Sequence, residues 1–234
     1  MKQKMMQDLK GDAILARNGK LGSLKDVYFD DERWTVCYFV VDTGGWFSGR
    51  EALISPHLVR AHEGRARELQ VELTREELER APGPAEHPPA SRLHEAARSA
   101  DSAYPAYRSA PYLWVGTPSP LAVPPPQLER DPGDARNEAA VQAQKRAEQS
   151  HLRSAAELVG YHIHARDGDL GHVEDFVVES DTWTITGMVV DTRNWLPGKK
   201  VLVPPSAVES VDWHARRVAV RRTRAELERS PEPR

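Results

Sequence analysis

A single offset aligns the two ends of this sequence. Adding 149 to any position from 11 to 82 gives its counterpart in 160–231 without a gap, and about 40% of these pairs are identical. Chance would give roughly one identity in sixteen for an average composition. We therefore expect one structural unit to occur twice in the chain.

The identical pairs belong to the residue types on which a fold depends. They include glycines at positions where the backbone needs a positive φ or a close approach, and large apolar residues of a core. The glycine and tryptophan pairs are Gly11 with Gly160, Gly19 with Gly168, Gly22 with Gly171, Gly49 with Gly198, Trp34 with Trp183, and Trp46 with Trp195.

Within each repeat, short apolar runs alternate with turn signals. Asn18-Gly19 and Asp167-Gly168 predict two-residue hairpin turns of type I′. The β-branched and aromatic run from 34 to 41 predicts a strand, as does its counterpart from 183 to 190. Each repeat closes with a capping box, which predicts a short helix. The two boxes are Thr74-x-x-Glu77 and Thr223-x-x-Glu226.

These patterns predict an all-β fold with short helices. About six short strands in each repeat favour a small closed or partly closed barrel, because closure removes exposed edges. We expect one barrel in 1–82 and another in 154–234, each around its own apolar interior. A unit this small is marginal alone, so the two barrels are expected to pack on each other or to form a homodimer.

Between the repeats lies a connector, residues 83–153, which begins with a proline-rich stretch. Its second part, from 134 to 150, has a helix-forming composition. The proline-rich part carries four aromatic residues that are unexpected in a solvated segment, and we expect them either to dock on a barrel or to contact a partner. They are Tyr104, Tyr107, Tyr112 and Trp114.

Charge and cysteine content limit the function classes. The chain has 32 basic and 35 acidic side chains, a formal net charge of −3, so no global field attracts nucleic acid or an anionic membrane. Cys37 is the single cysteine, which fits a reducing compartment, and we expect a cytoplasmic protein. No stretch approaches the roughly 20 apolar residues of a transmembrane helix, and no export signal is evident.

The residues also resemble a known family, the PRC-barrel domain. In the second repeat the resemblance is carried by 158–161, 167–176, 189–192 and 195–205, and in the first by 18–22, 40–43 and 46–50. The resemblance implies a non-catalytic barrel that mediates protein contacts. The family includes the cytoplasmic part of the photosynthetic reaction-centre H subunit and the last domain of a ribosome-maturation factor.

Two groups of side chains could carry chemistry. His162 and His164 alternate on one strand, and His172 lies across the expected hairpin, so a metal site is conceivable, although exposed strand histidines are the commoner case. Asp42 and Asp191 each follow a buried strand, where such a carboxylate more often accepts backbone N–H bonds in the next turn. We therefore predict no enzyme activity, no metal and no cofactor.

Two further groups could contact a partner. Trp46 and Trp195 lie in glycine-bearing loops and are expected to cover a barrel end or to anchor a contact. A basic cluster near the end of the chain could meet RNA or an acidic partner, although a solvated strand edge is the commoner case. It comprises Arg216, Arg217, Arg221, Arg222 and Arg224.

The function predicted from sequence is that of a scaffold or adaptor with an unknown protein partner. One alternative is an RNA- or ribosome-associated factor that uses the arginine cluster. The other is an accessory of a membrane photosynthetic complex, similar to the H subunit.

Overall fold

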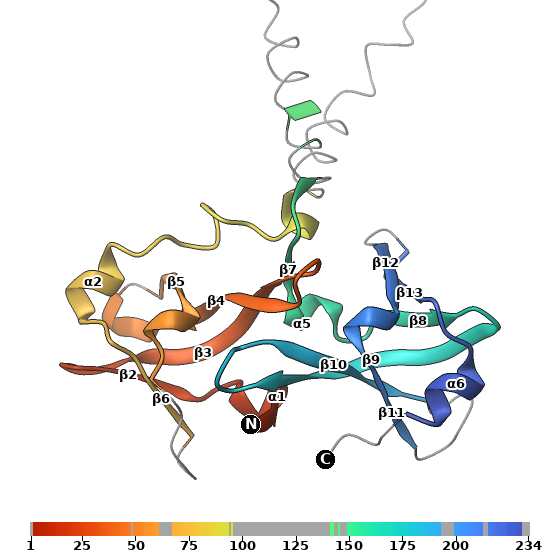
Figure 1. Ribbon diagram of the computed structural model, residues 1–234. Helices are drawn as coiled ribbons and strands as arrows, with labels where there is room; N and C mark the ends of the chain where they lie inside the picture. The colour runs from red at the N-terminus through yellow and green to blue at the C-terminus, as the bar shows by residue number, and fades with distance from the viewer. Residues whose placement is uncertain are drawn as a thin grey trace, which may run out of the picture. The chain divides into compact units, whose positions relative to one another are not determined.

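The computed structural model describes residues 2–47, 49–60, 67–93, 95, 141–142, 145, 149–192, 199–212 and 215–230. The chain forms two units, Met1–Pro89 together with His151–Arg234, and Ala90–Ser150. The first unit contains both repeats and all the strands named below (Figure 1).

The first repeat forms a six-stranded sheet in which one strand comes from the second repeat. The order is β5-β4-β3-β2-β6, with β7 on the free part of β3. All pairs are antiparallel except β2 with β6. Its elements are β1 (Gln3–Met5), α1 (Met6–Leu9), β2 (Ala13–Ala16), β3 (Gly19–Asp30), β4 (Thr35–Asp42), η1 (Gly44–Phe47), β5 (Glu51–Ile54), η2 (Pro56–Leu58), β6 (Glu68–Gln70) and α2 (Arg75–Glu79).

The second repeat forms a seven-stranded sheet with the corresponding order and one additional strand, β12, at its end. It runs β11-β10-β9-β8-β13-β12, with β1 of the first repeat on β9 and with β8 and β13 parallel. Its elements are β7 (Leu152–Ser154), α5 (Ala155–Leu158), β8 (His162–Ala165), β9 (Gly168–Glu179), β10 (Ile185–Asp191), β11 (Lys200–Val203), η3 (Pro205–Ala207), β12 (Val208–Asp212), β13 (Arg217–Val220) and α6 (Arg224–Glu228).

The all-β prediction and the duplicated unit are thus confirmed. In each sheet the order of hydrogen-bonded strands begins and ends at an edge strand. Within the described residues, the strands therefore do not close into a complete barrel.

The two repeats exchange their first strand and helix. β1 pairs with β9, where Lys4 lies opposite Val178, and β7 pairs with β3, where Arg153 lies opposite Phe29. These two ladders are counterparts at the offset of 149, so a pseudo-two-fold relation connects them. Leu152 and Arg153 of β7 lie inside the range assigned to the connector from sequence, and the strand is positioned by the sheet of the other repeat.

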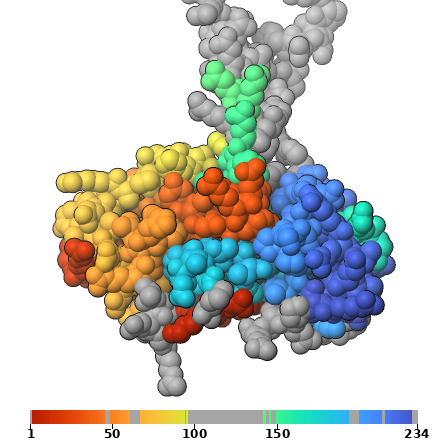
Figure 2. Space-filling view, in the orientation of Figure 1, coloured from red at the N-terminus to blue at the C-terminus, as the bar shows by residue number. Residues whose placement is uncertain are grey.

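The apolar interiors of the two repeats join at this exchange. The expectation of two separate interiors is wrong, because one cluster of buried side chains includes residues of both repeats. Phe29 and Phe176 lie 5.6 Å apart between ring centroids, and Phe39 meets the edge of Trp183 at 4.7 Å. In Figure 2 the surfaces of the two repeats, orange and cyan to blue, adjoin directly. Aromatic rings large enough to cross the junction make the core continuous.

The predicted hairpins form, but with a different turn. Ala16 pairs with Gly19, so the loop residues are Arg17 and Asn18, and neither has the positive φ that a type I′ turn requires. Gly19 takes the positive φ, 130°, and its counterpart Gly168 takes 134°. The Asn18 side chain instead accepts the backbone N–H of Arg75 at the start of α2, which ties the turn to the helix.

Both predicted capping boxes are confirmed. The hydroxyl of Thr74 accepts the N–H of Glu77, whose carboxylate accepts the N–H of Thr74, and Thr223 with Glu226 repeats this arrangement. Each box satisfies two backbone donors that a helix start leaves open. The helices α2 and α6 therefore begin where the sequence predicts.

Candidate functional site

The exchange places each short exchanged helix against the long strand of the other repeat. Asp26 of β3 accepts the backbone N–H of Ala156 in α5, 3.0 Å away, and Asp175 of β9 accepts that of Gln7 in α1, 3.1 Å away. A carboxylate at the first turn of a helix satisfies an open N–H group. The two aspartates, which are counterparts in the repeats, therefore fasten the exchanged segments.

The two aspartate sites differ at one neighbouring position. In the first, the Ser154 hydroxyl donates to Oδ2 of Asp26 at 2.5 Å, and the same hydroxyl accepts the N–H of Glu157. In the second, Met5 occupies the position of Ser154, and α1 has no side-chain cap. Oδ2 of Asp175 is buried without a hydrogen-bond partner. The second site thus lacks a donor that the first one has.

Burial dominates the acidity of both carboxyl groups. It raises the pKa of Asp175 to about 6, although the N–H groups of Phe176 and Gln7 act in the opposite direction. The pKa of Asp26 is also raised by burial, against the hydrogen bonds from Ser154 and Ala156. A carboxylate in a poorly solvated place holds its proton more tightly.

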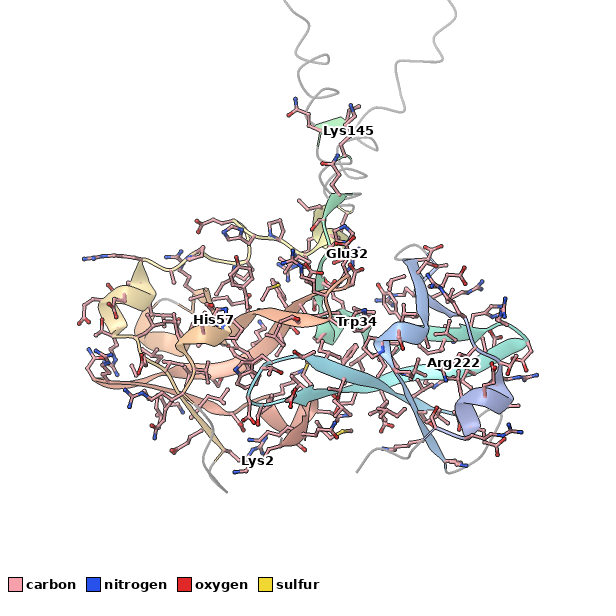
Figure 3. The ribbon with its side chains drawn as sticks, viewed as in Figure 1. Lys2, Glu32, Trp34, His57, Lys145 and Arg222 are labelled. Atoms are coloured by element: carbon pink, nitrogen blue, oxygen red, sulfur yellow. The ribbon has the colours of Figure 1, made fainter. Side chains whose placement is uncertain are left out.

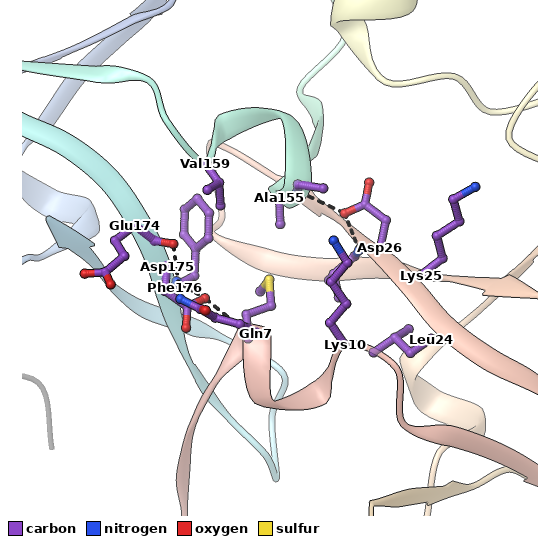
Figure 4. A pocket seen from close by; sticks show the side chains of 13 residues that line it. Gln7, Lys10, Leu24, Lys25, Asp26, Ala155, Val159, Glu174, Asp175 and Phe176 are labelled. Carbon is purple, nitrogen blue, oxygen red and sulfur yellow. Dashed lines mark hydrogen bonds between the residues drawn. The ribbon is translucent and has the colours of Figure 1, made fainter. Parts of the chain in front are cut away.

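A cavity of about 210 Å³ lies between α1 and α5 and is lined by both aspartates (Figure 4). Its apolar walls come from both repeats, for example Met6 and Leu24 from the first and Phe176 from the second. Val159, at the end of α5, also lines it and is 47% exposed. The exchange thus builds a small, mainly apolar hollow with two carboxyl groups.

Two tryptophans mark the centre of the junction. Trp34 and Trp183 are buried, and both adopt a positive φ, 53° and 55°. The N–H of Val36 donates to the carbonyl of Trp183 at 2.9 Å, and that of Ile185 to the carbonyl of Trp34 at 2.7 Å. Figure 3 labels Trp34 at this place. A positive φ at a bulky residue is unfavourable, so the surrounding contacts must hold it in place.

The predicted partner contacts lie outside the described residues or side chains. Trp195 and the aromatic segment of the connector, Tyr104, Tyr107, Tyr112 and Trp114, are among the residues that are not described. Trp46 belongs to η1 (Gly44–Phe47), but its side chain is not described. All six stay predictions.

The members of the arginine cluster have different local contacts. Arg216 lies over the ring of Tyr161 at 5.9 Å and has a positive φ of 49°. Arg224 contacts Asp167, whose carboxylate accepts its backbone N–H. Arg217 begins β13, and Arg221 and Arg222 follow that strand as exposed residues, Arg222 close to α6 in Figure 3. Their contact with RNA or an acidic partner stays a prediction.

The candidate catalytic and metal-binding residues have structural contacts. Oδ1 of Asp42 accepts the N–H of Gly44 at 2.9 Å, as expected of a turn carboxylate. His164 contacts Asp169 at 2.9 Å, and the rings of His162 and His172 meet edge to face at 5.7 Å. Within the described part of the chain, no three His, Cys, Asp or Glu side chains are grouped so as to hold a metal.

Sequence reasoning missed the two aspartates and the position of Met5. Asp26 and Asp175 are an identical pair inside apolar strands, which was an available signal. Met5 and Ser154 lie outside the aligned window. The offset of 149 does continue through 3–9 and 152–158, but only Leu9 and Leu158 are identical there.

Comparison with known proteins agrees with the duplicated fold. The profile of the PRC-barrel domain matches residues 2–75 and 151–227, well over half of the chain. No curated protein matches the sequence. None of the helices in the described residues is long and apolar enough to cross a membrane. Both matched segments include the exchanged strand and helix, and the chain belongs to the PRC-barrel domain family, of which it carries two copies.

Proposed function

We propose that this protein is a non-catalytic scaffold whose two fused repeats present binding surfaces to a partner protein. The observation that carries the proposal is that the carboxyl groups at the junction of the two repeats have a structural role. Asp26 and Asp175, the most unusual carboxyl groups of the fold, cap the exchanged helices. The hydroxyl beside Asp26, that of Ser154, is used to cap α5, and within the described residues no three His, Cys, Asp or Glu side chains are grouped at either aspartate.

The reciprocal exchange supports a scaffold because it makes the two repeats one body. Each repeat completes its sheet with a strand of the other, and the aromatic core crosses between them. Rigid presentation of contact residues lowers the entropy cost of binding a partner. We place the partner contacts at the aromatic residues of the connector and at Trp46 and Trp195, because tyrosine and tryptophan are enriched among the residues that dominate interface energies.

A cross-linked capture experiment in the native host tests this function. The wild-type chain is compared with a variant in which Tyr104, Tyr107, Tyr112 and Trp114 are changed to alanine. A matched control carries alanine at four polar residues of the same connector, Arg130, Asp131, Arg136 and Asn137. We expect one protein to be enriched by the wild type and the control and lost with the aromatic variant, and then to bind purified wild-type chain directly. Equal capture by all three chains, or no direct binding, contradicts the proposal.

An anionic partner such as RNA is the second candidate, favoured by the outer face of β8, β9 and β13. Arg217 lies beside His162 in register, and His162 lies opposite His172. The counterparts in the first repeat are Glu68, Ala13 and Ser23, so the second repeat alone has a basic row here. Binding of a single-stranded RNA oligonucleotide should weaken steeply with salt and weaken further in Arg217→Gln. Salt-independent binding, or none, contradicts this candidate.

The remaining proposals concern location. We place the protein in the cytoplasm, since its single cysteine fits a reducing compartment. An accessory role beside a membrane photosynthetic complex predicts co-fractionation with that complex. Recovery apart from it after gentle lysis contradicts that role.

A further inference from the structure

The cavity between α1 and α5 contains the carboxyl group of Asp26, on which the charge of Lys10 acts, and that of Asp175. Asp26 and Asp175 both line it, and among the described residues neither forms an ion pair. Asp175 is 2% exposed, and its Oδ2 has no hydrogen-bond donor. Burying a carboxylate without a compensating charge is unfavourable. The cavity therefore favours an occupant that brings a positive charge or a strong donor.

The apolar walls of the cavity favour an occupant whose charged group is carried on an apolar stem. α5 contributes Ala155 and Ala156 to the lining, Val159 follows directly after it, and Phe176 faces them from β9 (Figure 4). The volume of about 210 Å³ is below that of sites for drug-sized ligands and suits one extended side chain or a small amine.

Two of the other charged groups at the cavity form ion pairs. Lys25 pairs with Glu51, and Glu174 pairs with Lys200 at 2.7 Å. Lys10 lines the cavity and is exposed. It lies at the position that Val159 occupies in the second repeat, so one rim of the cavity is basic and the other is apolar. The occupant is expected to enter past Val159.

We propose that this cavity receives the side chain of a lysine presented by the partner protein, with its methylene stem against the apolar walls and its ammonium group toward Asp175 and Asp26. The inference rests on the scaffold function proposed above and gives the partner a chemical feature. Lysine combines a flexible four-carbon stem with a compact charge, which matches an apolar wall that ends in carboxyl groups.

Binding at this site should be linked to the protonation of Asp175 and should therefore depend on pH. Because the pKa of Asp175 is raised to about 6 in the empty site, the carboxyl group is partly protonated below that pH. A bound ammonium group favours the ionised carboxylate and lowers its pKa. Binding should therefore release a proton near pH 6, strengthen as pH rises from 5 to 7, and change little above that. The charge of Asp8 in α1 also raises the pKa of this carboxyl group, and the other titratable groups that line the cavity near it are Lys10, Lys25, Asp26 and Glu174.

The test uses the full chain and two matched probes. Nα-acetyl-lysine N-methylamide carries the charge, and Nα-acetyl-norleucine N-methylamide has the same stem without it. Binding is followed by NMR shifts of the backbone amides of 155–159 and 174–176. We expect the lysine probe to bind with a Kd on the order of millimolar, as suits so small a ligand, and to lower the pKa of Asp175. The norleucine probe should bind at least about fivefold more weakly.

Two variants decide the outcome. Asp175→Asn keeps the acceptor for Gln7 and should weaken the lysine probe at least about fivefold, whereas Lys10→Gln removes a like charge and should strengthen it. Equal binding of both probes, or shifts confined to other residues, overturns the inference. If Asp175→Asn loses the probe yet captures the partner as the wild type does, the lysine assignment fails and the scaffold function stands.

Discussion

The asymmetry between the two aspartate sites predicts that Met5→Ser stabilises the protein. The new hydroxyl would stand where Ser154 stands in the other site, able to donate to Oδ2 of Asp175 and to accept the N–H of Asp8 at the start of α1. A serine cap in place of a residue without an acceptor is worth about 1 kcal/mol. Supplying a donor to a buried carboxylate oxygen is worth about 1–3 kcal/mol.

The cost of the substitution is the apolar contact of Met5. Its side chain is half-buried, so its removal costs about 1 kcal/mol. The net increase in the free energy of unfolding is therefore about 1–3 kcal/mol at pH 7.5. Met5→Ala loses the same contact without gaining the hydroxyl, and it should be about 2–4 kcal/mol less stable than Met5→Ser.

Urea unfolding of the full chain, followed by tryptophan fluorescence and circular dichroism, measures these differences. At pH 5, where Asp175 is mainly protonated, the advantage of Met5→Ser over Met5→Ala should shrink to the capping contribution of about 1 kcal/mol. In an Asp175→Asn background it should shrink at both pH values. A Met5→Ser protein no more stable than Met5→Ala at pH 7.5 refutes the reasoning.

Three other predictions concern the same fold. Because the pKa of Asp175 rises from 3.8 unfolded to about 6 folded, its contribution to stability is complete below about pH 4 and is lost as pH rises through 6. The full pKa shift corresponds to about 3 kcal/mol of stability, and because the cavity admits solvent we expect a loss of about 1–2 kcal/mol. The measurement is the free energy of unfolding of wild type and of Asp175→Asn at pH 4.5 and at pH 7.5, where only the wild type should show this loss. Gly22→Ala would bring a Cβ to 2.1 Å from the carbonyl oxygen of Asp42, so it should lower the free energy of unfolding by more than about 3 kcal/mol. In Gly11→Ala the new Cβ meets open space, and only the positive φ should cost about 1 kcal/mol. Similar losses of stability in the two variants would contradict the close approach at Gly22. Phe176→Ala removes a ring that packs in the core shared by both repeats, and it should lower the free energy of unfolding by about 3–5 kcal/mol. Unfolding should remain a single transition, and separate transitions for the two repeats would contradict a common core.

Much of each repeat could be predicted from the sequence because its signals are local. The turn residues at 18–19 and 167–168, the β-branched runs and the capping boxes act within a few positions, and they predicted the hairpins, strands and final helices. The turn type was wrong because the glycine, and not the loop residues before it, adopts the positive φ.

The exchange could not be predicted from these signals. A strand such as β1 has the same local pattern whether it pairs with β3 of its own repeat or with β9 of the other, since main-chain hydrogen bonds carry little sequence information. The choice depends on tertiary contacts, namely the aspartate caps and the aromatic rings that cross the junction. The single interior follows from the same contacts.

The candidate site was hidden for a related reason. Each aspartate site joins the two repeats: Ser154 contacts Asp26 from 128 positions away, and Gln7 contacts Asp175 from 168 positions away, so these relations appear only when the exchanged segments are in place. An identical aspartate inside each long strand was a sign of a shared role. The difference between the two sites depends on a serine and a methionine that no alignment by identity would match.

The reciprocal exchange is tested most directly by backbone NOEs in isotope-labelled full chain. We expect contacts between Lys4 and Val178 and between Arg153 and Phe29, as the two exchanged ladders require. Contacts between Lys4 and Phe29 and between Arg153 and Val178 would show that each repeat keeps its own first strand, and they would rule out the exchange.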